Sequence, residues 1–114
     1  MKEVKNKVDC FVKDGDEISI SIRAGDGQTV SSYFEKPDME PVNGQVENEY
    51  LGKGAILKDK KLLVISMITR VNQDTDRASI SYILTTAPIT EQPFSEQFES
   101  QDNSIRFITT LIFK

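Results

Sequence analysis

The chain has 114 residues, of which 38% are hydrophobic and 28% are charged, and its net charge is −4. That balance is ordinary for one folded unit, so we expect residues 1–114 to form a single domain. The sequence contains no histidine and one cysteine, Cys10, which excludes histidine-dependent catalysis, zinc bound by histidine and an internal disulfide. The acidic balance argues against binding to nucleic acid or to anionic membranes.

The same composition bears on where the protein is found. No apolar stretch reaches the ~20 residues that a membrane-spanning helix needs, and the first residues lack the apolar core of a signal peptide. We therefore expect a cytoplasmic protein. A secreted protein that has lost its signal peptide and gained Met1 would show the same pattern, so that alternative stays open.

Three alternating segments open the chain, at Val4–Lys13, Glu17–Arg23 and Gln28–Phe34. Short Gly- and Asp-containing turns separate them, so we expect three strands that pair in sequence as a meander. The first strand carries charged residues on one side and Asn6 on the other, which suits the edge of a sheet. Cys10 lies on its apolar side and is predicted to be a small core residue.

A long acidic connection, Pro37–Gly52, follows the third segment. It is predicted to contain a short strand at Gln45–Leu51, and Ala55–Leu57 is predicted to form another. Loops of this length in a compact domain are often functional, so its polar residues are candidates for binding a partner. These candidates are Asp38, Glu40, Glu47, Glu49 and Tyr50.

The longest apolar run of the chain is Lys61–Val71, and its β-branched residues favour a strand. A short polar turn, Asn72–Asp76, separates it from the alternating segment Arg77–Thr86, so the two are predicted to pair as a hairpin. Both faces of Lys61–Val71 are largely apolar. We therefore expect both of its faces to be covered.

The end of the chain combines a second acidic connection with a strong strand at Ser104–Lys114. Within the connection, Pro93–Glu99 is predicted to form one or two helical turns, because Phe94 and Phe98 are spaced i,i+4. The last strand is apolar enough to require an interior position or a partner. The outer apolar faces of Lys61–Val71 and Ser104–Lys114 are expected either to be covered by Phe94 and Phe98 or to form a subunit interface. Both phenylalanines are also candidate binding residues.

About seven strands with at most one short helix predict an all-β fold, an antiparallel β-sandwich. The sandwich is favoured because the long acidic connection can carry the chain from one sheet to the other. A small closed β-barrel is the alternative.

Two pairs of aspartates in predicted turns suggest a metal site. Calcium prefers several oxygen ligands, and Asp14, Asp16, Asp74 and Asp76 offer carboxylates on sandwich loops. The simpler interpretation is that aspartate is common in turns because its side chain bonds the nearby backbone. Apart from this calcium, no cofactor is expected.

These observations favour a non-enzymatic protein-interaction module. It would bind another protein, or a second copy as a homodimer, through its acidic loops or an apolar strand face. The alternatives are a β protein that binds a small apolar ligand or a sugar, and a calcium-dependent binding module. No residue is assigned a catalytic role, because the chain has no histidine, and no tryptophan to stack on a sugar ring.

Overall fold

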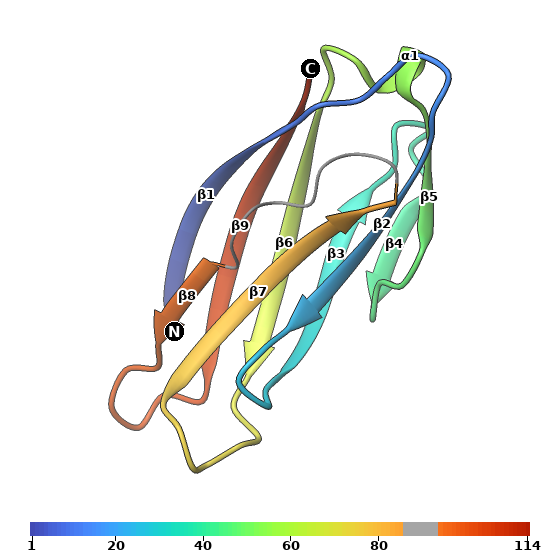
Figure 1. The fold of residues 1–114 in the computed structure, drawn as a ribbon. Coiled ribbons are helices and arrows are strands. Elements are labelled where there is room, and N and C mark those ends of the chain that lie inside the picture. Colours follow the sequence, from blue (N-terminus) through green and yellow to red (C-terminus); the bar gives the residue numbers. More distant parts are fainter. Residues whose placement is uncertain (86–93) are drawn as a thin grey trace.

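The structure is a computed structural model that describes residues 1–85 and 94–114, and these residues form two packed β-sheets (Figure 1). In chain order the elements are β1 Lys2–Cys10, β2 Glu17–Ala24, β3 Thr29–Glu35, β4 Pro41–Gly44, β5 Glu49–Lys53, α1 Gly54–Leu57, β6 Lys61–Thr69, β7 Arg77–Leu84, β8 Phe94–Gln97 and β9 Ser104–Phe113.

The sandwich prediction is confirmed. One sheet has five strands in the order β1-β9-β6-β3-β4, and the other has four in the order β5-β2-β7-β8. Within the described ranges no strand pairing joins the edges of the two sheets, so the barrel alternative is wrong. Two of the nine strands, β4 and β8, have only four residues each and were not separated as strands by the sequence pattern.

The apolar faces of the alternating segments in β2 and β7 are buried, from Ile18 to Ile22 and from Ala78 to Leu84. Both faces of Lys61–Val71 were expected to be covered, but among the described residues β6 buries one face and leaves Leu63 and Ile65 exposed on the other. Cys10 also belongs to the core, as expected. The largest side chains with almost no exposure fill the space between the sheets: Phe34, Tyr82, Phe107 and Phe113.

The predicted hairpin of Lys61–Val71 and Arg77–Thr86 is wrong. Strand β6 pairs with β3 and β9, whereas β7 pairs with β2 and β8 in the opposite sheet. Asn72–Asp76 therefore forms an arch between sheets, seen at the lower end of the molecule in Figure 1. The predicted meander is wrong for the same reason, because β1 and β3 lie in one sheet and β2 in the other.

The two ends of the chain lie side by side in the five-stranded sheet. Strand β1 is its edge, as predicted, and pairs in parallel with β9 from Lys2 opposite Ile105 to Cys10 opposite Phe113. Strand β9 lies between β1 and β6, so the expectation of an interior position for the last strand is confirmed.

Two short segments differ from their predicted type. Ala55–Leu57 belongs to the helix α1, whose first amide, on Gly54, donates to the Asp16 carbonyl. Phe94–Gln97 is the strand β8 and not a helical turn, because Ile80 to Phe94 is a cross-strand pair that directs Phe94 toward the core. Pro93, the predicted start of that turn, lies outside the described residues. The strand predicted at Gln45–Leu51 forms later, as β5.

Candidate functional site

The outward side of the five-stranded sheet carries a cluster of large apolar side chains. Across the sheet, Ile108 on β9 lies opposite Ile65 on β6, which lies opposite Tyr33 on β3. Leu63 is 53% exposed, Tyr33 40% and Ile65 37%. We call this cluster the outer apolar face, and its members are Tyr33, Leu63, Ile65, Met67, Ile108 and Ile112.

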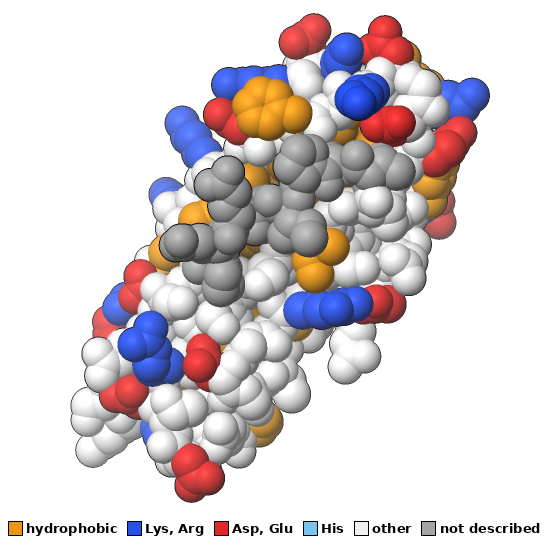
Figure 2. All heavy atoms as spheres, in the orientation of Figure 1, with side chains coloured by type: hydrophobic (Ala, Val, Ile, Leu, Met, Phe, Trp, Pro, Cys, Tyr) orange, Lys and Arg blue, Asp and Glu red, His pale blue; other side chains and the backbone are white. Residues whose placement is uncertain are grey.

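The outward side of the four-stranded sheet is polar by comparison. Figure 2 views the molecule from this side, and white, the colour of other side chains and backbone, predominates in the lower half of the view. Serines occupy many of the outward positions of β2, β7 and β8, although Ser21 and Ser79 are buried and Ile83 is apolar. These serines are Ser19, Ser21, Ser79, Ser81 and Ser95. The same fold thus presents one serine-rich sheet surface and one apolar sheet surface, and only the second has the composition of an interaction site.

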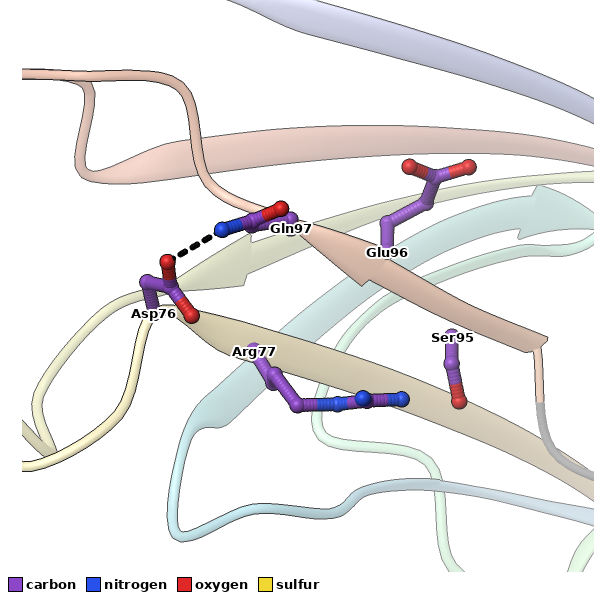
Figure 3. Close-up of a pocket in the computed structure, with 5 residues that line it drawn as sticks. All are labelled: Asp76, Arg77, Ser95, Glu96 and Gln97. Carbon is purple, nitrogen blue, oxygen red and sulfur yellow. Dashed lines mark hydrogen bonds between the residues drawn. The ribbon is translucent and has the colours of Figure 1, made fainter.

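A polar hollow of about 320 Å³ lies at the lower end of the serine-rich surface (Figure 3). Gln97 donates a hydrogen bond to the carboxylate of Asp76, and the Arg77 side chain lies along β7 nearby. Glu96, which also lines the hollow, is turned away from Arg77 and pairs with Lys2 at 2.8 Å. The described contacts of the hollow, Gln97 with Asp76 and Glu96 with Lys2, are not an arrangement typical of a catalytic pair.

Charged residues border the outer apolar face at both of its side edges. On β1, Lys5 and Lys7 project to the same side as the face and have no ion pair among the residues that the structure describes. Together with Ile108 and Thr110 they line a hollow of about 340 Å³. On the other edge, Glu35 of β3 is exposed and accepts a hydrogen bond from the Tyr33 hydroxyl at 3.3 Å.

The carboxylates of the long acidic connection are largely paired with cations. The Lys36 ammonium lies 3.9 Å from Glu40 and 3.7 Å from Glu49. Arg23 binds Glu47 at 2.8 Å. These ion pairs hold three of the carboxylates against two cations of the chain, so those carboxylates are less available to a partner, although the connection remains acidic.

The other two candidates from this connection also have contacts within the chain. The Asp38 carboxylate accepts a hydrogen bond from the Glu40 amide at 3.1 Å, which is a local turn contact. The Tyr50 hydroxyl donates to Glu17, and this hydrogen bond raises the pKa of Tyr50. Asp38 and Tyr50 do line one hollow of about 310 Å³, with Ile56 and Lys60.

Phe94 and Phe98 lie on the opposite sheet from the outer apolar face. Phe98 is buried, with the Arg70 guanidinium 5.9 Å from its ring centre. Phe94 packs on the core with its ring edge-to-face against Tyr82, at 6.4 Å between centres. These two residues therefore do not cover the outward sides of β6 and β9.

The four aspartates of the suggested calcium site are not brought together. Asp14 and Asp16 precede β2, whereas Asp74 and Asp76 precede β7. Because β2 and β7 are antiparallel neighbours, their starts lie at opposite ends of the sheet. Asp14 pairs with Lys58 at 2.8 Å, and the described residues contain no cluster of three or more carboxylate, thiol or imidazole groups suited to a metal.

Several residues around the outer apolar face were not singled out from the sequence. The apolar outward sides of β6 and β9 were visible as period-two patterns. The sequence did not show which other residues lie beside those strands, because that depends on the order β1-β9-β6-β3. These residues are Tyr33, Lys5, Lys7 and Glu35. The alternation along each strand showed on which side these residues lie. It could place them beside the apolar residues only once the strand order was known.

Cys10 gives a prediction that checks the core assignment. Burial raises the pKa of its thiol to about 11, and the neighbouring Asp9 charge adds to the rise. At pH 8 such a thiol is ~0.1% thiolate, against ~10% for an ordinary one, and the thiolate is the reactive form. We expect an aromatic disulfide reagent to modify the native protein at least ~100-fold more slowly than the protein unfolded in guanidinium. Complete reaction of the native protein at the unfolded rate would contradict this placement.

Comparison with known proteins gives no further guide to the site. No protein-family model, curated protein or solved structure matches the chain. Within residues 1–85 and 94–114, no helix has the length and apolarity to cross a membrane.

Proposed function

We propose that this protein is a non-enzymatic interaction module that binds a protein partner through the outer apolar face. The observation that carries the proposal is the row Ile108–Ile65–Tyr33, flanked by Leu63 and Met67, on a regular sheet surface. Each large apolar side chain that becomes fully buried contributes about 1.5–3 kcal/mol to association. A contiguous cluster of six can therefore outweigh a substantial part of the entropy lost on binding.

Other features support this surface over the alternatives. Lys36 and Arg23 form ion pairs with carboxylates of the acidic connection, so these carboxylates are less available to bind a partner. The space between the sheets is filled by Phe34, Tyr82 and Phe107, which favours binding on the outside over a ligand held inside.

The substitution Ile65→Lys tests the proposal, because it places a charge at the centre of the face on an exposed, regular strand position. The variant and the wild-type protein are each immobilised and exposed to an extract of the cells that make the protein. We expect the variant to retain at least ~10-fold less of the partner than wild type does. The melting temperature should stay within ~3 °C, because exposed positions usually cost little stability.

Glu47→Lys is the matched control, because it places the same new charge on the acidic connection. It should leave partner retention unchanged. Retention that survives Ile65→Lys and is lost with Glu47→Lys would move the binding surface to the acidic loops and contradict the proposal.

A further inference from the structure

We infer that the partner on the outer apolar face is a second copy of this chain, packed face to face about a two-fold axis parallel to the strands. This inference rests on the proposed function, because it uses the same surface. It adds the identity of the partner and the geometry of the complex. Charge, shape and area at the face each support it.

The unpaired charges on the two edges of the face are opposite. The outward side of β1, one strand beyond β9, carries Glu3, Lys5, Lys7 and Asp9. Glu3 pairs with Arg106 at 2.7 Å and Asp9 with Lys114 at 3.2 Å, so among the described residues the lysines are the charges left without an ion pair. Glu35 lies on β3, one strand beyond β6. The boundary between β9 and β6 is the centre of the four strands β1-β9-β6-β3. The basic edge on β1 and the acidic edge on β3 are therefore equally distant from that centre, at about 7 Å for strands spaced ~4.8 Å apart.

A two-fold axis through this centre and parallel to the strands brings the two edges together. It places β1 of one copy over β3 of the other and keeps positions along the strands unchanged. Lys7 shares its cross-strand row with Thr110 and Leu63, and Glu35 lies two residues beyond Tyr33, beside that row. Lys7 of each copy then faces Glu35 of the other, within the ~30° rotation usual between packed sheets.

The alternative two-fold axis, perpendicular to the strands in the plane of the face, is disfavoured. It would place β1 over β1 and, where the axis crosses β1 at Asn6, bring Lys5 of one copy against Lys7 of the other. Like charges facing each other across an interface oppose that arrangement. The charge pattern therefore selects the axis along the strands.

The shape of the face agrees with the same axis. Tyr33 is a large side chain on the acidic edge, and the hollow of about 340 Å³ lies on the basic edge. Tyr33 shares a row with Lys5, because both lie opposite the pair Ile108 and Ile65. The axis along the strands directs each Tyr33 ring to the hollow of the second copy, where a lysine ammonium can contact the ring face.

The area is sufficient for a specific dimer. Strand β6 has nine residues and spans about 31 Å, and the four long strands of the sheet span about 19 Å. The flat area is then about 600 Å² per copy, which is the lower end of the range for specific protein interfaces. The side chains that project from this area add to it.

Reversal of the two charges tests both the partner and the geometry. Lys7→Glu and Glu35→Lys each place like charges opposite one another in the dimer, and the double variant restores the pair in reverse. We expect sedimentation velocity to show that the wild-type protein is a dimer. The dimer dissociation constant of each single variant should be at least ~10-fold higher than that of wild type, and that of the double variant should lie within ~3-fold of wild type. Circular dichroism melting confirms that all four proteins are folded.

Two results would overturn the inference. One is a wild-type protein that stays monomeric up to about 1 mM, well above the range of a specific dimer. The other is a dimer that neither single variant weakens, or whose weakening the double variant does not repair. In both cases, retention of a different protein that depends on Ile65 would support the proposed function and reject only the second copy as the partner.

Discussion

Replacement of Gln28 by alanine is expected to lower the free energy of unfolding by ~3 kcal/mol and the melting temperature by roughly 10 °C. The Gln28 side chain is 7% exposed and makes four hydrogen bonds to the backbone. Its amide nitrogen donates to the carbonyls of Asn72 and Arg77, each at 3.2 Å. Its carbonyl oxygen accepts from the amides of Val71 at 2.8 Å and Asn72 at 2.9 Å.

The cost is large because one side chain satisfies groups in a connection far away in sequence. Gln28 follows the turn from β2 to β3, and its partners lie in the arch from β6 to β7. Both connections cross between the sheets at the same end of the molecule (Figure 1). Alanine would leave two amides and two carbonyls without their hydrogen-bond partners. Each buried group that stays unpaired lowers the free energy of unfolding by about 1–3 kcal/mol, and water that reaches the group reduces this cost.

Gln73→Ala is the matched control, because Gln73 is an exposed glutamine in the same arch and its side chain has no hydrogen bond among the described residues. Urea unfolding should show a change within ~0.5 kcal/mol for this variant. Equal stability losses at positions 28 and 73 would contradict the role assigned to Gln28.

Gly54→Ala is expected to destabilise the protein by ~3 kcal/mol or more. A Cβ at position 54 would lie 1.8 Å from the carbonyl oxygen of Lys13, a backbone atom that cannot rotate away. The Gly54 amide also donates to the Asp16 carbonyl at 2.8 Å, and the Ala55 amide donates to the Asp14 carbonyl at 3.1 Å. The added methyl would therefore separate α1 from the connection between β1 and β2.

Gly15→Ala provides the control for this prediction within the connection that α1 contacts. No atom lies within 4 Å of a Cβ built at Gly15, so the methyl group has room. We expect its unfolding free energy to stay within ~0.5 kcal/mol of wild type in the same urea titration. A Gly54→Ala protein as stable as Gly15→Ala would show that α1 does not pack against Lys13 as described.

The faces of the strands could be predicted from the sequence because they depend on local alternation. Ile18, Ile20 and Ile22 alternate with polar residues, and each of them is buried. The last strand was less clear, because Ile108 and Ile112 lie on the face opposite to Ile105 and Phe107. Burial of one face follows from a period of two whichever strands become neighbours.

The strand pairing could not be predicted in the same way. A five-residue polar link such as Asn72–Asp76 can join neighbouring strands ~4.8 Å apart, or it can arch between sheets ~10 Å apart. The choice is made by contacts distant in sequence, here the hydrogen bonds of Gln28 to the backbone of Val71 and Asn72. The short segment at Phe94 changed type for a similar reason, because its pairing with β7 determined its conformation.

The candidate site was only partly visible in the sequence. Glu40, Glu47 and Glu49 were candidates because they cluster along the chain. In the fold, Lys36 lies between Glu40 and Glu49, and Arg23 pairs with Glu47. The outer apolar face gathers residues from three strands, and its charged edges come from β1 and β3. Such a surface exists only after the strand order β1-β9-β6-β3 has formed.

Oxidative footprinting of methionines measures whether a partner covers the outer apolar face in the cell. Met67 lies on the face, whereas Met39 is 73% exposed in the turn between β3 and β4 and serves as an internal control. The ratio of Met67 to Met39 oxidation is measured in the cells that make the protein and in dilute purified Ile65→Lys. We expect at least a ~3-fold lower ratio in cells, because a covered thioether is shielded from the oxidant. An equal ratio in the two samples would show that the face is uncovered and would contradict the proposed function.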